Sequence, residues 1–346
     1  MKRYYFVVGV LFMYLLMTSV ALPQTAKKGG RGLFRVYSAE TIGTANLYTN
    51  FFFSSFMKKS TRNTMLKDQT ASIGITFGFA RHFETYLYLV PYQDDHQSLW
   101  GPPGDTDLGI KFHLPYSSSA FHVGTQLFAS FPTANTPNVP YEPFSTRSVS
   151  WGGYLLFTAS FAETFPMLPF KLHANIGYID QAVEDQFFTS EIDQLLLGFG
   201  AVFPIRSFQL YTEFTSESFM NQPEIPFSSN SMRVTQGFKF IGPKEIIFDV
   251  VFDYGLTNKD SVNALKSQSK SSEYVKDYFD WKFSVGATFR FSLNKFFDDS
   301  DEEAKKREAE EQRKLDQIKS KRSKADEDLE NMKKILEKKR SKETDK

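Results

Sequence analysis

The segment WKFSVGATFRFSL, residues 281–293, alternates apolar and polar or small residues without interruption. Its apolar residues all occupy odd positions, from Trp281 to Leu293. Successive side chains of a β-strand point to opposite faces, so the pattern predicts a strand with one apolar and one wet environment. Its thirteen residues exceed the five or six that are typical of soluble sheets and suffice to cross a bilayer at a tilt.

The same alternation recurs at residues 107–114, 170–178 and 245–254. A soluble sandwich would show it too, so strand length and loop order must separate the two classes. We expect short turns at residues 81–82, 115–119, 162–169, 204–207 and 241–244. We expect longer polar loops at residues 58–69, 93–104, 132–148, 180–190, 217–230 and 257–277. Short turns on one side and long loops on the other are typical of bacterial outer-membrane barrels.

Counting strands from residues 45–57 to residues 278–293 gives twelve. An even count returns the last strand to the side where the first began, which closure of an antiparallel barrel requires. We therefore predict an all-β antiparallel transmembrane barrel of about 12 strands. Residues 32–39 form one more short strand-like run, which either lies inside the barrel or pairs at its rim. If this run and a missed partner were membrane strands, the count would be fourteen.

The final predicted strand carries a recognisable pattern. Residues 284–291, SVGATFRF, follow the order polar, any, Gly, any, any, aromatic, any, aromatic, with Ser284, Gly286, Phe289 and Phe291 at the defined positions. The body thereby resembles porin-like outer-membrane β-barrels. The resemblance implies recognition by the barrel assembly machinery and contact with outer-membrane lipid. In such proteins the pattern usually ends the chain, whereas here fifty-three residues follow Leu293.

The N-terminus has the features of an export signal. Lys2 and Arg3 precede an apolar run, and Ser19-Val20-Ala21 supplies small residues for cleavage. We predict a signal peptide at residues 1–21, with an uncleaved anchor as the alternative, and a periplasmic or lumenal segment at residues 22–44. The barrel would occupy residues 45–293. The absence of cysteine rules out a lipoprotein anchor and a disulfide-stapled domain.

Residues 294–346 form a charged tail. From Asp298 onward it holds sixteen acidic and sixteen basic residues, no aromatic residue and neither Gly nor Pro. Acid-to-base pairs at four-residue spacing, such as Glu302 with Lys306, favour a helix, and a heptad-like seam leaves a weak coiled coil open. The balanced charge argues against nucleic acid. A periplasmic partner or peptidoglycan is the expected contact, with both termini in the periplasm of a Gram-negative cell.

The body shows little reactive chemistry. It contains no HExxH, GxSxG or phosphate-binding loop, so we expect no enzyme, no cofactor and no metal site. His113 and His122 flank a predicted turn and face the same way, which fits either a metal or proton-linked role or two ordinary lumenal imidazoles. Four aspartates, at positions 94, 95, 105 and 107, could bind Ca²⁺ or simply belong to a solvated loop.

Charged and polar residues on the predicted wet faces define the expected lumen. If the last two strands pair at an index sum near 535, Lys282 meets Asp253 and Arg290 meets Glu245, with Lys239 reaching Glu245 as well. These pairs would either brace a narrow barrel or line a polar conduit. The lumen-lining candidates are Lys111, His113, His122, Lys171, His173, Glu213, Lys239, Glu245, Asp249, Asp253, Lys282 and Arg290.

These features predict an outer-membrane channel that passes small hydrophilic solutes. The second class is a structural anchor whose tail fastens the outer membrane to a periplasmic element. A transporter of hydrophobic ligands is the third, suggested only by the 37 phenylalanines. The short run at residues 32–39 discriminates among them, because inside the lumen it would block the pore and favour an anchor or a gated transporter.

Overall fold

The computed structural model describes residues 24–59, 65–94, 104–115, 120–134, 148–161, 170–181, 193–205, 207–220, 227, 230–242, 246–257 and 280–293. The predicted signal peptide and charged tail lie outside these residues. The strands are β1 (Asn46–Lys59), β2 (Met65–Ala80), β3 (Phe83–Asp94), β4 (Thr106–His113), β5 (Phe121–Phe131), β6 (Ser150–Ser160), β7 (Lys171–Asp180), β8 (Asp193–Ile205), β9 (Phe208–Phe219), β10 (Ser231–Ile241), β11 (Ile247–Gly255) and β12 (Trp281–Ser292).

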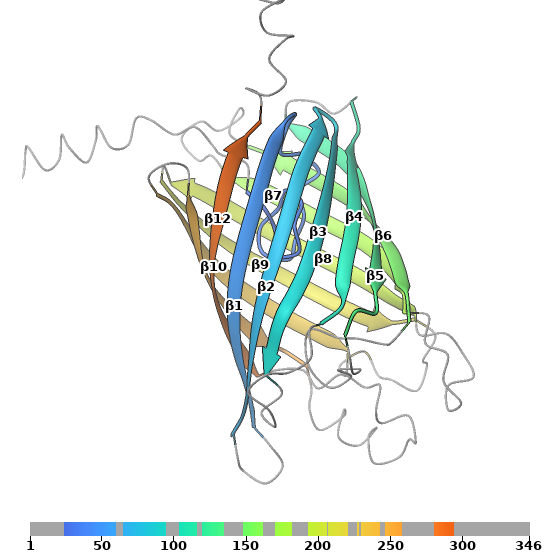
Figure 1. The fold of residues 1–346 in the computed structure, drawn as a ribbon, viewed down its shortest axis with the longest axis vertical. Helices are drawn as coiled ribbons and strands as arrows, with labels where there is room; N and C mark the ends of the chain where they lie inside the picture. Colours follow the sequence, from blue (N-terminus) through green and yellow to red (C-terminus); the bar gives the residue numbers. More distant parts are fainter. Residues whose placement is uncertain are drawn as a thin grey trace, which may run out of the picture. The chain divides into compact units, whose positions relative to one another are not determined.

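The strands form one closed antiparallel barrel, as Figure 1 shows. Each strand pairs with its neighbour in sequence. β1 closes the ring by pairing with β12, from Asn46 opposite Ser292 to Met57 opposite Trp281. Closure leaves no sheet edge, which is the condition for a sheet to cross a bilayer. The prediction of a porin-like β-barrel architecture with twelve strands is confirmed.

Inward and outward residues alternate around the barrel. On β12, Phe283, Val285 and Phe291 are exposed on the outer face, whereas Lys282 and Ser284 are buried inside. The other strands follow the same rule, so large apolar side chains cover the outside and polar ones line the interior. The described residues contain no helix that is long and apolar enough to cross a membrane.

Inward aromatic rings cover glycines on neighbouring strands. Tyr211 is the register partner of Gly237 on β10, and a Cβ at Gly237 would overlap the Tyr211 ring. Three more cross-strand pairs repeat this arrangement: Tyr86 with Gly109, Tyr154 with Gly177, and Phe52 with Gly286. The glycines leave space for rings to lie flat along the wall, as aromatic cover of strand glycines does in other sheets.

The loop expected at residues 58–69 is wrong. β1 and β2 remain paired out to Lys59 and Met65, so the connection shrinks to residues 60–64. Residues 58–69 show no apolar–polar alternation, so the periodicity gives no strand signal there. Backbone ladder hydrogen bonds continue there regardless of the side chains.

Candidate functional site: a plugged lumen

Residues 24–44 lie inside the barrel, where Figure 1 shows them as a coiled segment behind β1 and β2. We call this segment the plug. It folds on itself through isolated bridges, Thr25 with Arg31 and Gly32 with Tyr37, and it adds no strand to the sheet. Gly29 has a φ of 98°, a left-handed conformation that favours glycine. Leu33, Phe34, Val36 and Ala39 are fully or almost fully buried within the lumen.

Wall side chains hold the plug by its backbone. Glu213 of β9 accepts the backbone N–H groups of Phe34 at 2.8 Å, Val36 at 2.9 Å and Arg35 at 3.1 Å. Asn175 of β7 accepts the N–H of Tyr37 at 2.7 Å and donates to its carbonyl oxygen at 2.9 Å. These contacts satisfy backbone groups that have no sheet partner, which a buried irregular segment requires.

A second holding point lies on β3 and β4. Glu84 accepts the backbone N–H groups of Arg31 at 2.8 Å and Ile42 at 2.7 Å, and it forms a 2.6 Å ion pair with Lys111. Lys111 donates in turn to the carbonyl oxygens of Arg31 and Ser38. Both side chains of the ion pair are completely buried. Their mutual attraction and their hydrogen bonds to the plug backbone offset the cost of removing the two charges from water.

Ion pairs also link the plug to the opposite wall. Arg35 makes a two-pronged contact with Asp253 of β11, at 2.6 and 2.9 Å. Bidentate contacts of this kind fix orientation as well as adding energy. Lys239 of β10 donates to the Leu33 carbonyl oxygen at 2.9 Å and pairs with Asp249 at 3.2 Å.

The predicted charge pairs are realised in part. Asp253 and Lys282 are register partners at the index sum of 535. Lys239 pairs with Asp249, and Arg290 donates to Asn46 of β1. Glu245, the partner expected for both, lies outside the described residues. The candidates that contact the plug are Lys111, His122, Lys171, Glu213, Lys239 and Asp253. The sequence had predicted contacts among the wall residues instead.

Glu40, near the C-terminal end of the plug, also links the plug to the wall. It lies 3.0 Å from Arg31, 3.0 Å from Lys171 and 3.9 Å from His122. Burial by itself would raise the pKa of Glu40. The adjacent positive charges of Arg31 and Lys171 outweigh this effect and lower the pKa to about 2. The carboxylate therefore stays ionised and holds cations of both the plug and the wall.

Three histidines, His82, His113 and His122, lie close together near Glu40. The His113 and His122 rings lie 5.3 Å apart between centroids, although the register partner of His113 is Gly124. His82 joins them with its Nδ1 atom 3.1 Å from that of His113. His173 is separate, with its Nδ1 atom 2.9 Å from the Thr158 hydroxyl. Within the described part of the chain, no three metal-ligating residues are arranged to hold an ion.

The sequence reasoning missed several holding residues. Glu84 and Asn175 were not singled out, and neither were the plug residues Arg31, Arg35 and Glu40. Glu84 carried a usable signal, because it is a charged residue in phase with Tyr86 and Tyr88 on the inward face of a strand. The plug residues carried none, since their segment has no sustained periodicity.

The residues of the predicted assembly signal lie on β12. Ser284 is buried and lies 2.8 Å from the Ser54 hydroxyl of β1, while Gly286 faces the Phe52 ring. Phe289 packs edge-on against Phe51 on the outer face, and Phe291 is half exposed there. The pattern thus spans the seam at which the barrel closes.

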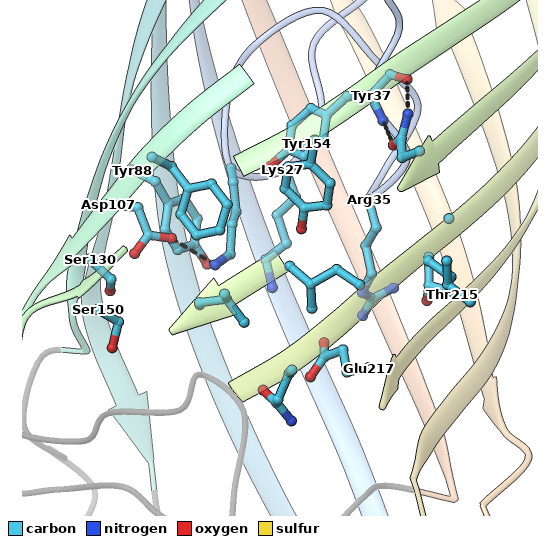
Figure 2. Close-up of a pocket in the computed structure, with 18 of the residues that line it drawn as sticks. Lys27, Arg35, Tyr37, Tyr88, Asp107, Ser130, Ser150, Tyr154, Thr215 and Glu217 are labelled. Atoms are coloured by element: carbon cyan, nitrogen blue, oxygen red, sulfur yellow. Dashed lines mark hydrogen bonds and ion pairs between the residues drawn. The ribbon is translucent and has the colours of Figure 1, made fainter. Parts of the chain in front are cut away.

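A cavity of about 200 Å³ lies between the plug and the strand ends that adjoin the long loops. Figure 2 shows Lys27 and Arg35 reaching into it from the plug, with Asp107, Ser130 and Ser150 on one side and Thr215 and Glu217 on the other. Six aromatic residues also line it: Phe34, Tyr37, Tyr86, Tyr88, Phe128 and Tyr154. Of the four aspartates considered for Ca²⁺, Asp107 instead pairs with Lys28 at 2.7 Å, and Asp105 accepts the Ala134 N–H at 3.3 Å.

No family model and no curated protein matches the sequence. Solved structures similar to it include the NanC porin, at 9% identity over 69% of this chain and 98% of that chain, with a TM-score of 0.47. The KdgM porin matches at 9% identity over 70% and 99%, with a TM-score of 0.43. An outer-membrane channel from Pseudomonas putida F1 matches at 8% identity over 73% and 98%, with a TM-score of 0.46.

Proposed function

We propose that this protein is an outer-membrane channel for small hydrophilic solutes, closed by its own N-terminal plug and opened when the plug moves. The observation that carries the proposal is the way the lumen is filled. A polar wall binds the backbone of a segment that belongs to no sheet, as Glu213 and Asn175 do for residues 34–37. We assign the protein no enzymatic reaction.

Placement in the outer membrane rests on the outer surface of the barrel. Exposed phenylalanine, leucine, isoleucine and valine side chains surround it, and such surface is stable against lipid rather than water. The two shortest connections, residues 81–82 and 206–207, share one rim with the beginning of β1 and the end of β12, and we assign this rim to the periplasm because periplasmic turns are short in such barrels. Insertion there would use the barrel assembly machinery.

The plug can leave without disturbing the barrel. Its wall contacts are made by side chains, whereas the ladder that closes the barrel is independent of them. A vacated lumen would be lined by polar groups and by charges of both signs, including Lys111, Glu84, Lys239 and Asp249. Such a lining favours small hydrophilic solutes and weak ion selectivity.

The closed lumen also favours the anchor as a second candidate. A permanently plugged barrel would serve as a membrane mount, and the tail would contact peptidoglycan or a periplasmic partner. The two functions differ in whether the plug ever leaves. Conductance through a protein with a lockable plug therefore separates them.

The chain has no cysteine, so a disulfide can be introduced cleanly. The Ser38 and Thr158 hydroxyl oxygens lie 3.4 Å apart, one on the plug and one on β6. We expect Ser38→Cys with Thr158→Cys to show no openings in a planar bilayer when oxidised and to regain wild-type openings after reduction. Each single cysteine variant serves as control and should be insensitive to oxidation.

A variant lacking residues 24–44 gives the opposite test. It should conduct continuously, provided that heat-modifiable electrophoretic mobility shows a closed barrel. If the deleted barrel is folded yet conducts no more than a bare bilayer, the channel is rejected and the anchor stands.

A further inference from the structure

The charges around the cavity between plug and wall are balanced. Three ion pairs, 2.6 or 2.7 Å long, engage six charged side chains of the lining and the adjacent wall: Lys28 with Asp107, Arg35 with Asp253, and Arg233 with Glu217. The other two charged side chains of the lining, Lys27 and Asp105, have opposite signs. A charged guest would lose its hydration here without gaining a counter-charge, so the balance favours an uncharged guest.

A chain of uncharged hydrogen bonds ends at the cavity with a donor. The Ser150 hydroxyl donates to the Gln181 carbonyl oxygen at 3.2 Å, and the Gln181 amide donates to the Gln194 Oε1 atom at 2.8 Å. The Gln194 Nε2 atom then has no acceptor among the described residues, although the side chain is only 1% exposed. The Thr215 hydroxyl, 9% exposed, also lacks a partner in that part of the chain. Buried polar groups without partners are unfavourable, so both favour a guest that carries hydroxyl or other oxygen groups.

Aromatic rings supply the apolar part of the lining. Tyr37 of the plug lies 6.3 Å from Tyr86 and 5.4 Å from Tyr154 between ring centroids, and Phe128 stacks on Tyr154 at 5.5 Å. Figure 2 shows Tyr37 and Tyr154 bordering the same space as Thr215. The faces of such rings carry a negative potential that attracts the C–H groups of a saturated ring. The volume of about 200 Å³ leaves room for one ring with its substituents.

We infer that this cavity binds an uncharged polyhydroxy compound built on a single ring, the chemistry of a neutral monosaccharide. One face of the ring lies against the tyrosines, and hydroxyls at opposite edges bond the Gln194 amide and the Thr215 hydroxyl. Gln194 lies opposite Phe219 of β9, four residues from Thr215, so the two groups are roughly 13 Å apart along the sheet, which their side chains and one ring can bridge. This assignment rests on the proposed function, for which it names the solute class. Because the plug supplies Tyr37, a bound sugar stabilises the plugged state.

Isothermal titration calorimetry on the full-length mature protein, in a detergent without a sugar headgroup, tests the inference. The probes are the neutral sugars glucose and galactose, the anionic glucuronate and the cationic glucosamine, which share one kind of ring and differ in charge. We expect at least one neutral sugar to bind about tenfold more tightly than either charged one. Gln194→Leu and Thr215→Val should each weaken that sugar about five- to tenfold, because each removes one hydrogen bond from a buried site.

Gln209→Leu and Thr288→Val are the matched controls, because both residues are inward and buried but do not line the cavity. They should bind the neutral sugar as the wild type does. The inference is overturned if neither neutral sugar binds, if a charged sugar binds as tightly, or if cavity and control variants lose affinity equally. Sugar binding to a barrel that never conducts would overturn the channel and leave the ligand class standing. Conduction without sugar binding would overturn the ligand class alone.

Discussion

Replacement of Glu213 by alanine should release the middle of the plug while leaving the barrel closed. The carboxylate accepts three backbone N–H groups, those of Phe34, Arg35 and Val36. At about 1 kcal/mol of net stability for each hydrogen bond, the loss is about 3 kcal/mol. Since about 1.4 kcal/mol corresponds to a factor of ten, plug opening should become about 100-fold more frequent.

Glu213→Gln refines this test, because its amide oxygen can take the place of Oε1, which accepts the N–H groups of Phe34, Arg35 and Val36. Only the second Arg35 contact, to Oε2, is then lost, so the loss should be at most about 1 kcal/mol, or about fivefold in opening. Hydrogen–deuterium exchange of residues 34–36 in detergent measures both effects. Thr212→Ala is the control, since Thr212 bonds Gln236 on the outer face.

The reasoning is refuted if exchange of residues 34–36 is the same in Glu213→Ala as in wild type. It is refuted equally if β9 and its neighbours exchange faster to the same extent, because the carboxylate would then support the barrel rather than the plug. An alanine variant no more dynamic than the glutamine variant would show that the N–H contacts to Oε1 contribute nothing.

Two further predictions concern the lipid face and pH. Val285→Arg, on the outer face of β12, should lower the unfolding free energy by about 2–4 kcal/mol in urea titrations in lipid; a cost below that of Val285→Ala would refute a lipid-facing position. The depressed Glu40 pKa, about 2 against 4.5, gives plug binding a contribution that is fully present above about pH 4.5 and lost as pH falls toward 2. Exchange of residues 38–42 should therefore accelerate on acidification in wild type more than in Glu40→Gln, and equal acceleration would contradict this.

The barrel was predictable because each strand has an apolar outer face and a polar inner face. The alternation from Trp281 to Leu293 reflects both faces within a few residues, and the strands are long enough to cross a bilayer. The pairing of Asp253 with Lys282 followed from one index sum, because antiparallel neighbours keep a constant sum. Local pattern therefore determined the closed sheet.

The plug was not predictable to the same depth. Its location inside the lumen was one of two alternatives, and its contacts link residues far apart in sequence, such as Phe34 with Glu213 and Tyr37 with Asn175. Charged inward residues were recognisable, but their partners are backbone groups of residues 24–44. Backbone groups are the same in every residue, so no side-chain pattern reveals which of them a wall carboxylate will accept.

The kind of contact that holds the plug determines how it could move. If the plug leaves, wall groups such as Glu84, Asn175 and Glu213 exchange their hydrogen bonds with the plug backbone for hydrogen bonds with water. The net loss per hydrogen bond is therefore only about 0.5–1.5 kcal/mol. The apolar side chains Leu33 and Phe34 have no such substitute, and each costs about 1.5–3 kcal/mol when it leaves a buried site for water. The three N–H contacts of Glu213 alone amount to about 3 kcal/mol, so the polar contacts hold the plug at least as strongly as these two apolar side chains do. If the plug leaves, water can replace the polar contacts, whereas Leu33 and Phe34 become exposed to water unless another apolar surface covers them.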